Sequence, residues 1–286
     1  MKNPIVLLIV VQNPDFEVRT RLEQMLIWSR AMVVVDNSLE AAPPMEAENL
    51  HWLWNGNRNG LAGGLNQGME EAIRLNADWV LTLDQDSEFF SMESGMAFCA
   101  KAFSLPVETA WLSATHVFPF EMADFTEDPD CPPVTVEQSI TSGTLLRVLA
   151  FQQCGPFRED FFIDSIDHEY CFRLQEHGWK VQIHPGIGLK HQLGNTRRHK
   201  DFQGLEHYAS HHSPLRRYYM TRNRLWTIFH YRKSHQAFFR SELRDMAHEL
   251  GKVLVYEDHK IQKLWMFLCG VLDFLRGHMG ERSRLH

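Results

Sequence analysis

The fold is decided by the stretch Trp79-Val80-Leu81-Thr82-Leu83-Asp84-Gln85-Asp86-Ser87, in which an apolar run ends abruptly in two carboxylates. Its length and composition predict a buried strand over 79–83 and a turn over 84–87. Upstream, residues 5–11 and 32–35 predict two more strands, and Asp36-Asn37-Ser38 ends the second. Helical patterns lie between the strands. This alternation indicates a parallel sheet flanked by helices, whose ligands lie beyond the carboxyl ends of the strands.

The same periodicities extend along the chain. Strands are predicted over 5–11, 32–35, 51–54, 79–83, 110–117, 144–148 and 180–183, and helices over 16–28, 61–76 and 91–103, with another ending near 178. Apolar residues at helical spacing after residue 225 predict further helices. We therefore expect an α/β domain over residues 1–200 and a basic, mainly helical region over 201–286, since 286 residues exceed the ~100–200 of one domain.

The composition is that of an ordinary globular protein, with 44% hydrophobic and 23% charged residues, which excludes disordered, collagenous and coiled-coil classes. The longest apolar runs, residues 5–11 and 264–272, are far shorter than the ~20 residues of a membrane span. Five cysteines without a Cys-x-x-Cys pair argue against a disulfide framework and a structural zinc site. With no secretory signal expected after Lys2, a cytoplasmic location is predicted.

Charge is divided unevenly along the chain. Residues 1–196 carry 12 Lys and Arg against 27 Asp and Glu, whereas residues 197–286 carry 17 against 9. One interpretation of the basic region is a set of solvated helix surfaces packed on the main domain. The other is a peripheral contact with anionic lipid headgroups or with a diphosphate-bearing acceptor. Nucleic acid is disfavoured, because the preceding domain is strongly acidic and no stacking platform is evident.

Asp84 and Asp86 form the first candidate site. Two carboxylates at i and i+2 in a turn can both point into a crevice, where a divalent cation relieves their repulsion. Oxygen ligands favour Mg²⁺ or Mn²⁺ over zinc. The structural alternative is a solvated turn in which Asp86 caps the following helix.

Polar groups at two further strand ends are candidates for nucleotide binding. A carboxylate at Asp36 can accept hydrogen bonds from a pyrimidine base or a ribose, or can form an Asx-turn with Asn37 and Ser38. The loop Asn57-Arg58-Asn59-Gly60-Leu61-Ala62-Gly63-Gly64 resembles a phosphate-binding loop that opens a helix. The dinucleotide and Walker glycine patterns are absent, which disfavours nicotinamide enzymes and P-loop proteins.

A third acidic group precedes the helix that ends near residue 178. Asp164 and Asp167, three residues apart, can share a face of its first turn, and either can act as a general base toward a substrate hydroxyl. N-capping is the structural alternative. His191 follows a short apolar stretch, where a lone histidine is usually a structural hydrogen-bonding residue.

The ordered set of these motifs, with Thr141-Ser142-Gly143 between them, resembles the inverting family 2 glycosyltransferases, most closely bacterial rhamnosyltransferases of polysaccharide and O-antigen assembly. The resemblance covers about residues 5–195. It differs after the first strand, where Gln12-Asn13-Pro14 replaces the usual Thr-Tyr-Asn.

The resemblance implies a GT-A fold, a Rossmann-like and mostly parallel sheet. It implies Asp167 as the base, with Asp164 as the alternative, and a Mg²⁺ or Mn²⁺ ion held by Asp84, Asp86 and His191. The residues that it implies for the nucleotide sugar are Asp36, Asn37, Asn59, Gly60, Gly64, Asp84 and Ser142.

The implied reaction moves rhamnose from dTDP-rhamnose to a hydroxyl of a saccharide acceptor, lipid-linked, at the inner face of the cell membrane. Arg197, Arg198, Arg216, Arg217, Arg222 and Arg224 would attract that acceptor or anionic lipid. A homo-oligomer through the C-terminal helices is a further expectation. The alternatives are another pyrimidine sugar nucleotide as donor, a nucleotidyltransferase, and a non-catalytic nucleotide-sugar binder or scaffold.

Overall fold

The computed structural model describes residues 4–190, 197–200, 206–209 and 211–282. The chain divides into two compact units. The first comprises residues 1–159 and 167–192, and the second comprises residues 160–166 and 193–286. The division after residue 192 lies close to the one predicted after residue 200, but the short segment 160–166 joins the second unit.

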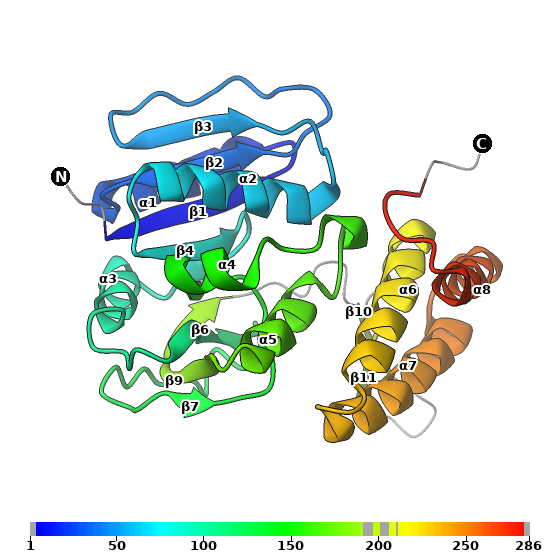
Figure 1. Cartoon of the computed structure of the whole chain (residues 1–286). Helices are drawn as coiled ribbons and strands as arrows, with labels where there is room; N and C mark the ends of the chain where they lie inside the picture. Colours follow the sequence, from blue (N-terminus) through cyan, green and yellow to red (C-terminus); the bar gives the residue numbers. More distant parts are fainter. Residues whose placement is uncertain (1–3, 191–196, 201–205, 210, 283–286) are drawn as a thin grey trace. The chain divides into compact units, whose positions relative to one another are not determined.

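The first unit contains a nine-stranded sheet with helices on both faces (Figure 1). Its strands are β1 (Ile5–Val11), β2 (Met32–Asp36), β3 (Leu50–Trp54), β4 (Trp79–Asp84), β5 (Glu88–Phe89), β6 (Thr109–Val117), β7 (Val134–Thr135), β8 (Thr144–Arg147) and β9 (Lys180–Lys190). Their order is β3-β2-β1-β4-β8-β6-β9-β5, with β7 paired to β9. Because only β5, β7 and β8 run against the others, the sheet is mostly parallel.

The helices associated with this sheet are α1 (Phe16–Trp28), α2 (Gly60–Arg74), α3 (Met92–Lys101), α4 (Val148–Cys154) and α5 (Ile166–Glu176). A 3₁₀ turn, Glu159–Phe161, follows α4. Asp15 caps α1 by accepting a hydrogen bond from the Val18 amide at 2.9 Å. The predicted α/β class is therefore confirmed.

Strand β1 lies at the centre of the core and is buried on both faces. Leu7, Ile9 and Val11 belong to the hydrophobic cluster that includes residues of α1 and α3. On the opposite face, a Cβ at Gly68 of α2 would lie 2.0 Å from Leu8 Cδ1, so the helix approaches the strand closely at this glycine. Burial on both faces explains why residues 5–11 are continuously apolar rather than alternating.

The second unit contains the hairpin of β10 (Arg197–Lys200) and β11 (Glu206–Ala209), followed by α6 (Pro214–Tyr231), α7 (Gln236–Tyr256) and α8 (Lys260–Arg276). Helices α6 and α8 pack closely, since a Cβ at Gly270 would lie 2.8 Å from the Tyr218 carbonyl oxygen. These helices confirm the expected helical C-terminal region. None of the described helices is long and apolar enough to cross a bilayer.

The basic residues of α6 correct one expectation. Arg217 pairs with Glu249 and Glu257, Arg224 pairs with Glu242 and Glu249, and Arg222 donates to backbone carbonyls. Arg217 and Arg222 are buried. These three guanidinium groups therefore bind partners within the unit and are not surface attractants for an anionic acceptor, as the charge pattern had suggested. The side chains of Arg197 and Arg198 lie outside the described ones.

Candidate functional site

The carboxyl ends of β1, β2 and β4 lie together. In the strand register, Val11 of β1 is opposite Asp36 of β2 and Val10 is opposite Asp84 of β4. The loop after β1 connects both neighbours, because the Gln12 amide donates to Gln85 Oε1 at 2.8 Å and the Asn13 amide donates to Ser38 Oγ at 2.7 Å. The loop that departs from the family pattern thus joins two of the predicted motifs.

Asp36 is fully buried at the end of β2. Its Oδ1 accepts hydrogen bonds from the Ser38 amide at 3.0 Å and from Ser38 Oγ at 2.5 Å, and its Oδ2 accepts one from the Ala42 amide at 2.7 Å. The carboxylate therefore forms the Asx-turn and fixes residues 38–42. A direct contact with a nucleotide base requires this loop to open, since Asp36 has no exposed surface.

Asn37 belongs to a network of asparagines that shapes the loop before α2. Its Oδ1 accepts from Asn55 Nδ2 at 2.5 Å, and its Nδ2 donates to Asn57 Oδ1 at 3.0 Å. Asn55 also donates to the Arg58 carbonyl oxygen at 2.8 Å. Asn57 and Asn59 both adopt left-handed backbone conformations, with φ of 56° and 57°. Asparagine tolerates this conformation better than most residues, which explains its repetition here.

The glycines of this loop permit close packing. A Cβ at Gly63 would lie 2.1 Å from the Arg58 carbonyl oxygen, and one at Gly64 would lie 2.9 Å from Val10 Cγ1. Gly60 has a φ of 62°. Close packing therefore explains the glycines at 63 and 64, and the left-handed backbone explains the glycine at 60. The predicted contact of Gly60 and Gly64 with a nucleotide sugar stays a prediction.

Glu159 contacts the predicted phosphate-binding loop through Asn59, and the sequence analysis did not identify this residue. Its carboxylate accepts a hydrogen bond from the side chain of Asn59 and another from Asn66 Nδ2, the latter at 3.0 Å. Asn66 also exchanges hydrogen bonds with the backbone of Phe157 at 2.8 and 2.9 Å. Glu159 follows Asn59 by a hundred positions, so no local spacing signals the pair.

The acidic turn after β4 lies against Ser142. The Asp84 amide donates to Ser142 Oγ at 3.0 Å, and the Ser87 amide donates to the Asp84 carbonyl oxygen at 3.1 Å. The Gly143 amide donates to the Thr82 carbonyl oxygen at 2.8 Å. The structure therefore brings the motif 141–143 and the acidic turn together, and the contact of Asp84 and Ser142 with a nucleotide sugar stays a prediction.

A hollow of about 230 Å³ adjoins Asp86. Two ion pairs lie in its wall, Arg21 with Glu17 at 2.7 Å and Lys190 with Glu88 at 2.9 Å. The Arg21 guanidinium also donates to the Gln85 carbonyl oxygen. Arg21 and Lys190 place positive charge beside the acidic turn, and no local pattern of residues predicts a role for either one.

The donor set at Asp84 and Asp86 fits a Mg²⁺ or Mn²⁺ ion. Mg²⁺ typically binds through one or two protein carboxylates and completes its shell with water and substrate phosphate oxygens. Among the described residues, no three His, Cys, Asp or Glu side chains gather as a metal-binding group. His191, the third predicted ligand, lies outside those residues.

The two candidate bases lie in different surroundings. Asp167 is the second residue of α5, and its Oδ1 accepts a hydrogen bond from the His168 amide at 2.9 Å. Asp164 belongs to the second unit, where Arg216 Nη2 donates to its Oδ1 at 3.0 Å. A carboxylate paired with a guanidinium is a poor proton acceptor, because the cation favours the charged form.

Comparison with solved structures defines the fold. The chain resembles S. aureus TarS with a TM-score of 0.56 and 13% identity over 95% of this chain and 48% of that one. It resembles TarS 1–349 with a TM-score of 0.54 and 12% identity over 96% of this chain and 82% of that one. It also resembles GalNAc-T7, solved with UDP, GalNAc and Mn²⁺, with a TM-score of 0.52 and 12% identity over 66% of this chain and 43% of that one. The chain thus spans under half of that first TarS chain and of the GalNAc-T7 chain. The predicted GT-A glycosyltransferase fold is confirmed.

The sequence comparison narrows the class. The chain is 26% identical to the dTDP-rhamnosyl transferase RfbF of Shigella flexneri over 98% of both chains. No protein-family model matches. Fold and full-length similarity together support a glycosyltransferase and confirm the resemblance to rhamnosyltransferases that the motifs indicated.

Proposed function

We propose that this protein is an inverting glycosyltransferase that moves rhamnose from dTDP-rhamnose to a hydroxyl of a saccharide acceptor in cell-surface polysaccharide synthesis. The observation that carries the proposal is the similarity to a dTDP-rhamnosyl transferase over 98% of both chains. The positions of Asp36 and Asp84 at the carboxyl ends of β2 and β4, with Ser142 beside Asp84, support it, because ligands of open α/β sheets bind at this edge.

At the donor, Asp84 and Asp86 would hold the divalent ion, with His191 as the third predicted ligand. This ion would supply Lewis-acid stabilisation of the charge that develops on the departing diphosphate. Arg21 and Lys190 line the hollow beside Asp86 and add positive charge near that diphosphate. The loops fixed by Asp36 and by Asn37 would enclose the nucleotide, with Asn59, Gly60, Gly64 and Ser142 as further predicted contacts.

At the acceptor, Asp167 is the proposed general base. It would remove the proton of the acceptor hydroxyl as that oxygen attacks the anomeric carbon from the face opposite the dTDP leaving group. The C–O bond to dTDP breaks as the new glycosidic bond forms, so a single displacement inverts the anomeric configuration. The pairing of Asp164 with Arg216 supports Asp167 rather than Asp164 in this role.

A donor panel tests the proposal. The purified protein is incubated with dTDP-rhamnose, dTDP-glucose, UDP-glucose and UDP-N-acetylglucosamine, with Mn²⁺, Mg²⁺ or EDTA, and nucleoside diphosphate release is measured. We expect release from dTDP-rhamnose that depends on the metal. Release only from another pyrimidine sugar nucleotide identifies that donor instead, and binding of dTDP-rhamnose without release in any condition identifies a binder or scaffold.

We also propose that the enzyme works at the cytoplasmic face of the cell membrane on a lipid-linked acceptor, and that α8 makes the membrane contact. Large apolar side chains on one face of α8 are exposed at spacings of four and three residues: Ile261, Trp265, Leu268, Leu272 and Leu275. The opposite face packs on α6 at Gly270. An amphipathic helix with tryptophan and leucine on its apolar face is typical of interfacial binding.

Charge favours an anionic bilayer over a second copy of the chain as the occupant of this face. The exposed charged residues of α8 are Lys260 and Arg276, at its two ends, and both are basic. Two α8 helices would place like charges together in either orientation, whereas anionic headgroups complement them. Among residues 211–282, seven exposed Lys and Arg side chains outnumber three exposed Asp and Glu.

Vesicle flotation tests the surface. We expect the protein to float with vesicles of phosphatidylcholine and phosphatidylglycerol and the Leu268→Ser/Leu272→Ser variant to remain unbound, while Leu243→Ser, which removes an exposed leucine of α7, binds normally. Equal binding of the α8 variant would overturn the assignment. A wild-type protein that forms a dimer and does not bind vesicles would also overturn the assignment. If the Leu268→Ser/Leu272→Ser variant were then monomeric, the result would support the predicted homo-oligomer.

A further inference from the structure

The segment 160–166, which leads directly into α5, has an unusual backbone. Phe162, Asp164 and Ser165 adopt left-handed conformations, with φ of 67°, 65° and 62°. Residues with a side chain rarely adopt this region, and three of them within four positions form an unfavourable segment unless its surroundings hold it. Asp167, the proposed base, follows Ser165 by two residues.

Asn223 of α6 holds this segment by its backbone. The asparagine is fully buried, and its Nδ2 donates to the carbonyl oxygens of Phe161 at 2.8 Å, Ile163 at 2.7 Å and Asp164 at 3.1 Å. A side-chain amide has two N–H donors, so three carbonyl oxygens share them. This side chain therefore contacts the backbone on both sides of Phe162, the first left-handed residue.

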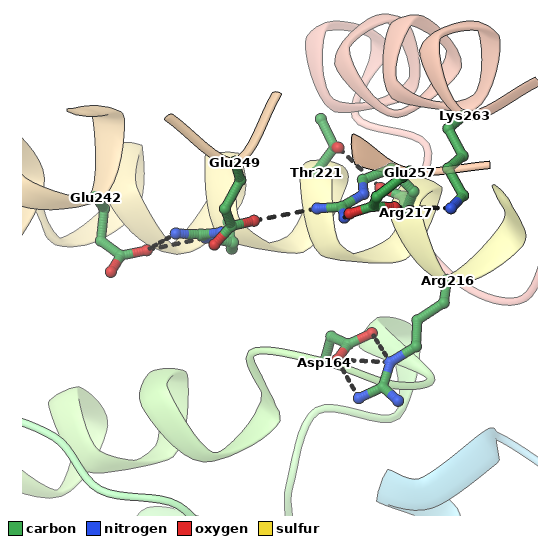
Figure 2. A network of polar contacts seen from close by, with 9 residues as sticks. Asp164, Arg216, Arg217, Thr221, Glu242, Glu249, Glu257 and Lys263 are labelled. Atoms are coloured by element: carbon green, nitrogen blue, oxygen red, sulfur yellow. Dashed lines mark hydrogen bonds and ion pairs between the residues drawn. The ribbon is translucent and has the colours of Figure 1, made fainter. Parts of the chain in front are cut away.

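Two arginines of α6 complete the attachment. Arg216 faces Asp164 in a forked contact, with Nε at 3.2 and 3.3 Å from the two carboxylate oxygens and Nη2 at 3.0 Å from Oδ1 (Figure 2). Arg222 Nη2 donates to the Asp160 carbonyl oxygen at 3.0 Å. The Phe162 ring stacks on Tyr219, with centroids 5.2 Å apart. One face of α6 thus contacts the segment from residue 160 to residue 164.

We propose that Asn223 and Arg216 are positioning residues for catalysis, because they impose the backbone conformation in which the chain enters α5 and so set the direction of the Asp167 carboxylate. The inference rests on the proposed function, in which Asp167 is the base. In this proposal the Asp164 carboxylate has a structural role, because Arg216 binds it and so holds the segment on α6.

The test compares Asn223→Leu, which keeps the side-chain volume and removes both donors, with Arg224→Met as the matched control. Arg224 also lies on α6, and it pairs with Glu242 and Glu249 rather than with the segment 160–166. The Arg224→Met substitution therefore removes two ion pairs but no contact with the segment. We expect Asn223→Leu to lower kcat at saturating donor by about 10- to 100-fold, with donor KM unchanged, and to accelerate amide exchange in residues 160–168. Arg224→Met should leave both readouts at wild-type values.

A surface pair provides a second set of variants that should fold, since the Arg216 side chain is 45% exposed. Arg216→Ala and Asp164→Asn should each lower kcat to a similar extent, the double variant should add nothing, and Arg216→Lys should restore part of the loss. Loss of all activity in Asp164→Asn alone would instead identify Asp164 as the base and overturn the inference.

The inference would also be overturned if amide exchange in residues 160–168 were unchanged in Asn223→Leu. An equal fall of kcat in Arg224→Met would overturn it as well. If the wild-type protein transfers no sugar from any donor, the proposed function fails. The exchange measurement then still shows whether Asn223 holds the segment, so the two failures are distinguishable.

Discussion

Arg217 donates a hydrogen bond to Glu257 at 3.2 Å, and both residues are buried. The other oxygen of Glu257 accepts from Lys263 Nζ at 2.7 Å, so one carboxylate serves two buried cations (Figure 2). Part of the positive charge in the C-terminal region is therefore internal to the helical unit. Sequence charge alone had indicated a basic surface.

Glu257→Gln should destabilise this unit strongly. The substitution removes the charge that Arg217 and Lys263 share, and breaking a buried pair in this way typically costs about 3–5 kcal/mol. We expect a lower free energy of unfolding in urea, followed by circular dichroism. Asp245→Asn, a carboxylate exposed on α7, is the control and should change stability little.

The strand ends of the site could be predicted from the sequence because they depend on local patterns. Residues 5–11 and 16–28 have the bounds that their periodicity indicated, and Asp36 and Asp84 lie at the carboxyl ends of β2 and β4, the two strands that flank β1. The strand predicted over 180–183 continues to residue 190 in β9, because Pro185 and Gly186 interrupt the apolar pattern without ending the strand. Helix α4 was missed because it begins at Val148, directly after β8.

The contacts that arrange the site could not be predicted, since they join distant positions. Asn59 with Glu159 and Asn223 with Ile163 have no local signature. The charge pattern also does not show which basic side chains are exposed. Arg217 and Arg222 were expected at the surface, and both are buried. Residue type gives the chemistry available at a position, but its partner depends on tertiary packing.

Asp167→Asn should lower the turnover number by about 10²- to 10⁴-fold, which is the usual contribution of a general base. The amide keeps the shape of the side chain but cannot accept the acceptor proton. Donor binding, measured by calorimetry with dTDP, should remain at the wild-type value. Glu176→Gln, an exposed carboxylate at the other end of α5, should turn over normally. Wild-type turnover in Asp167→Asn would exclude it as the base.

Gly63→Ala should destabilise the protein and weaken donor binding, although alanine normally favours a helix over glycine. The added Cβ would lie 2.1 Å from the Arg58 carbonyl oxygen, so the loop 55–59 must move. Gly251→Ala is the matched control, because a Cβ at that position of α7 meets nothing within 4 Å. The control should gain about 0.5–1 kcal/mol of stability. Equal gains in both variants, measured by urea unfolding, would show that the loop tolerates the shift.

His212 should make stability depend on pH. Burial, followed by the charges of Arg216, Arg217 and Lys263, lowers the pKa of this imidazole from 6.5 to about 4. Between these values the unfolded chain binds a proton that the folded chain does not, so the contribution of His212 to stability is present above pH 6.5 and is lost as the pH falls toward 4.

Because one pKa unit corresponds to 1.36 kcal/mol, His212 should account for a loss of about 2 kcal/mol between pH 7 and pH 5. The measurement is urea unfolding of the wild type and His212→Gln at both pH values. The variant should lose less stability than the wild type by about that amount, because glutamine does not titrate. His248→Gln, which replaces an exposed histidine of α7, should keep the wild-type difference. If His212→Gln also kept it, protonation of His212 would not be linked to unfolding.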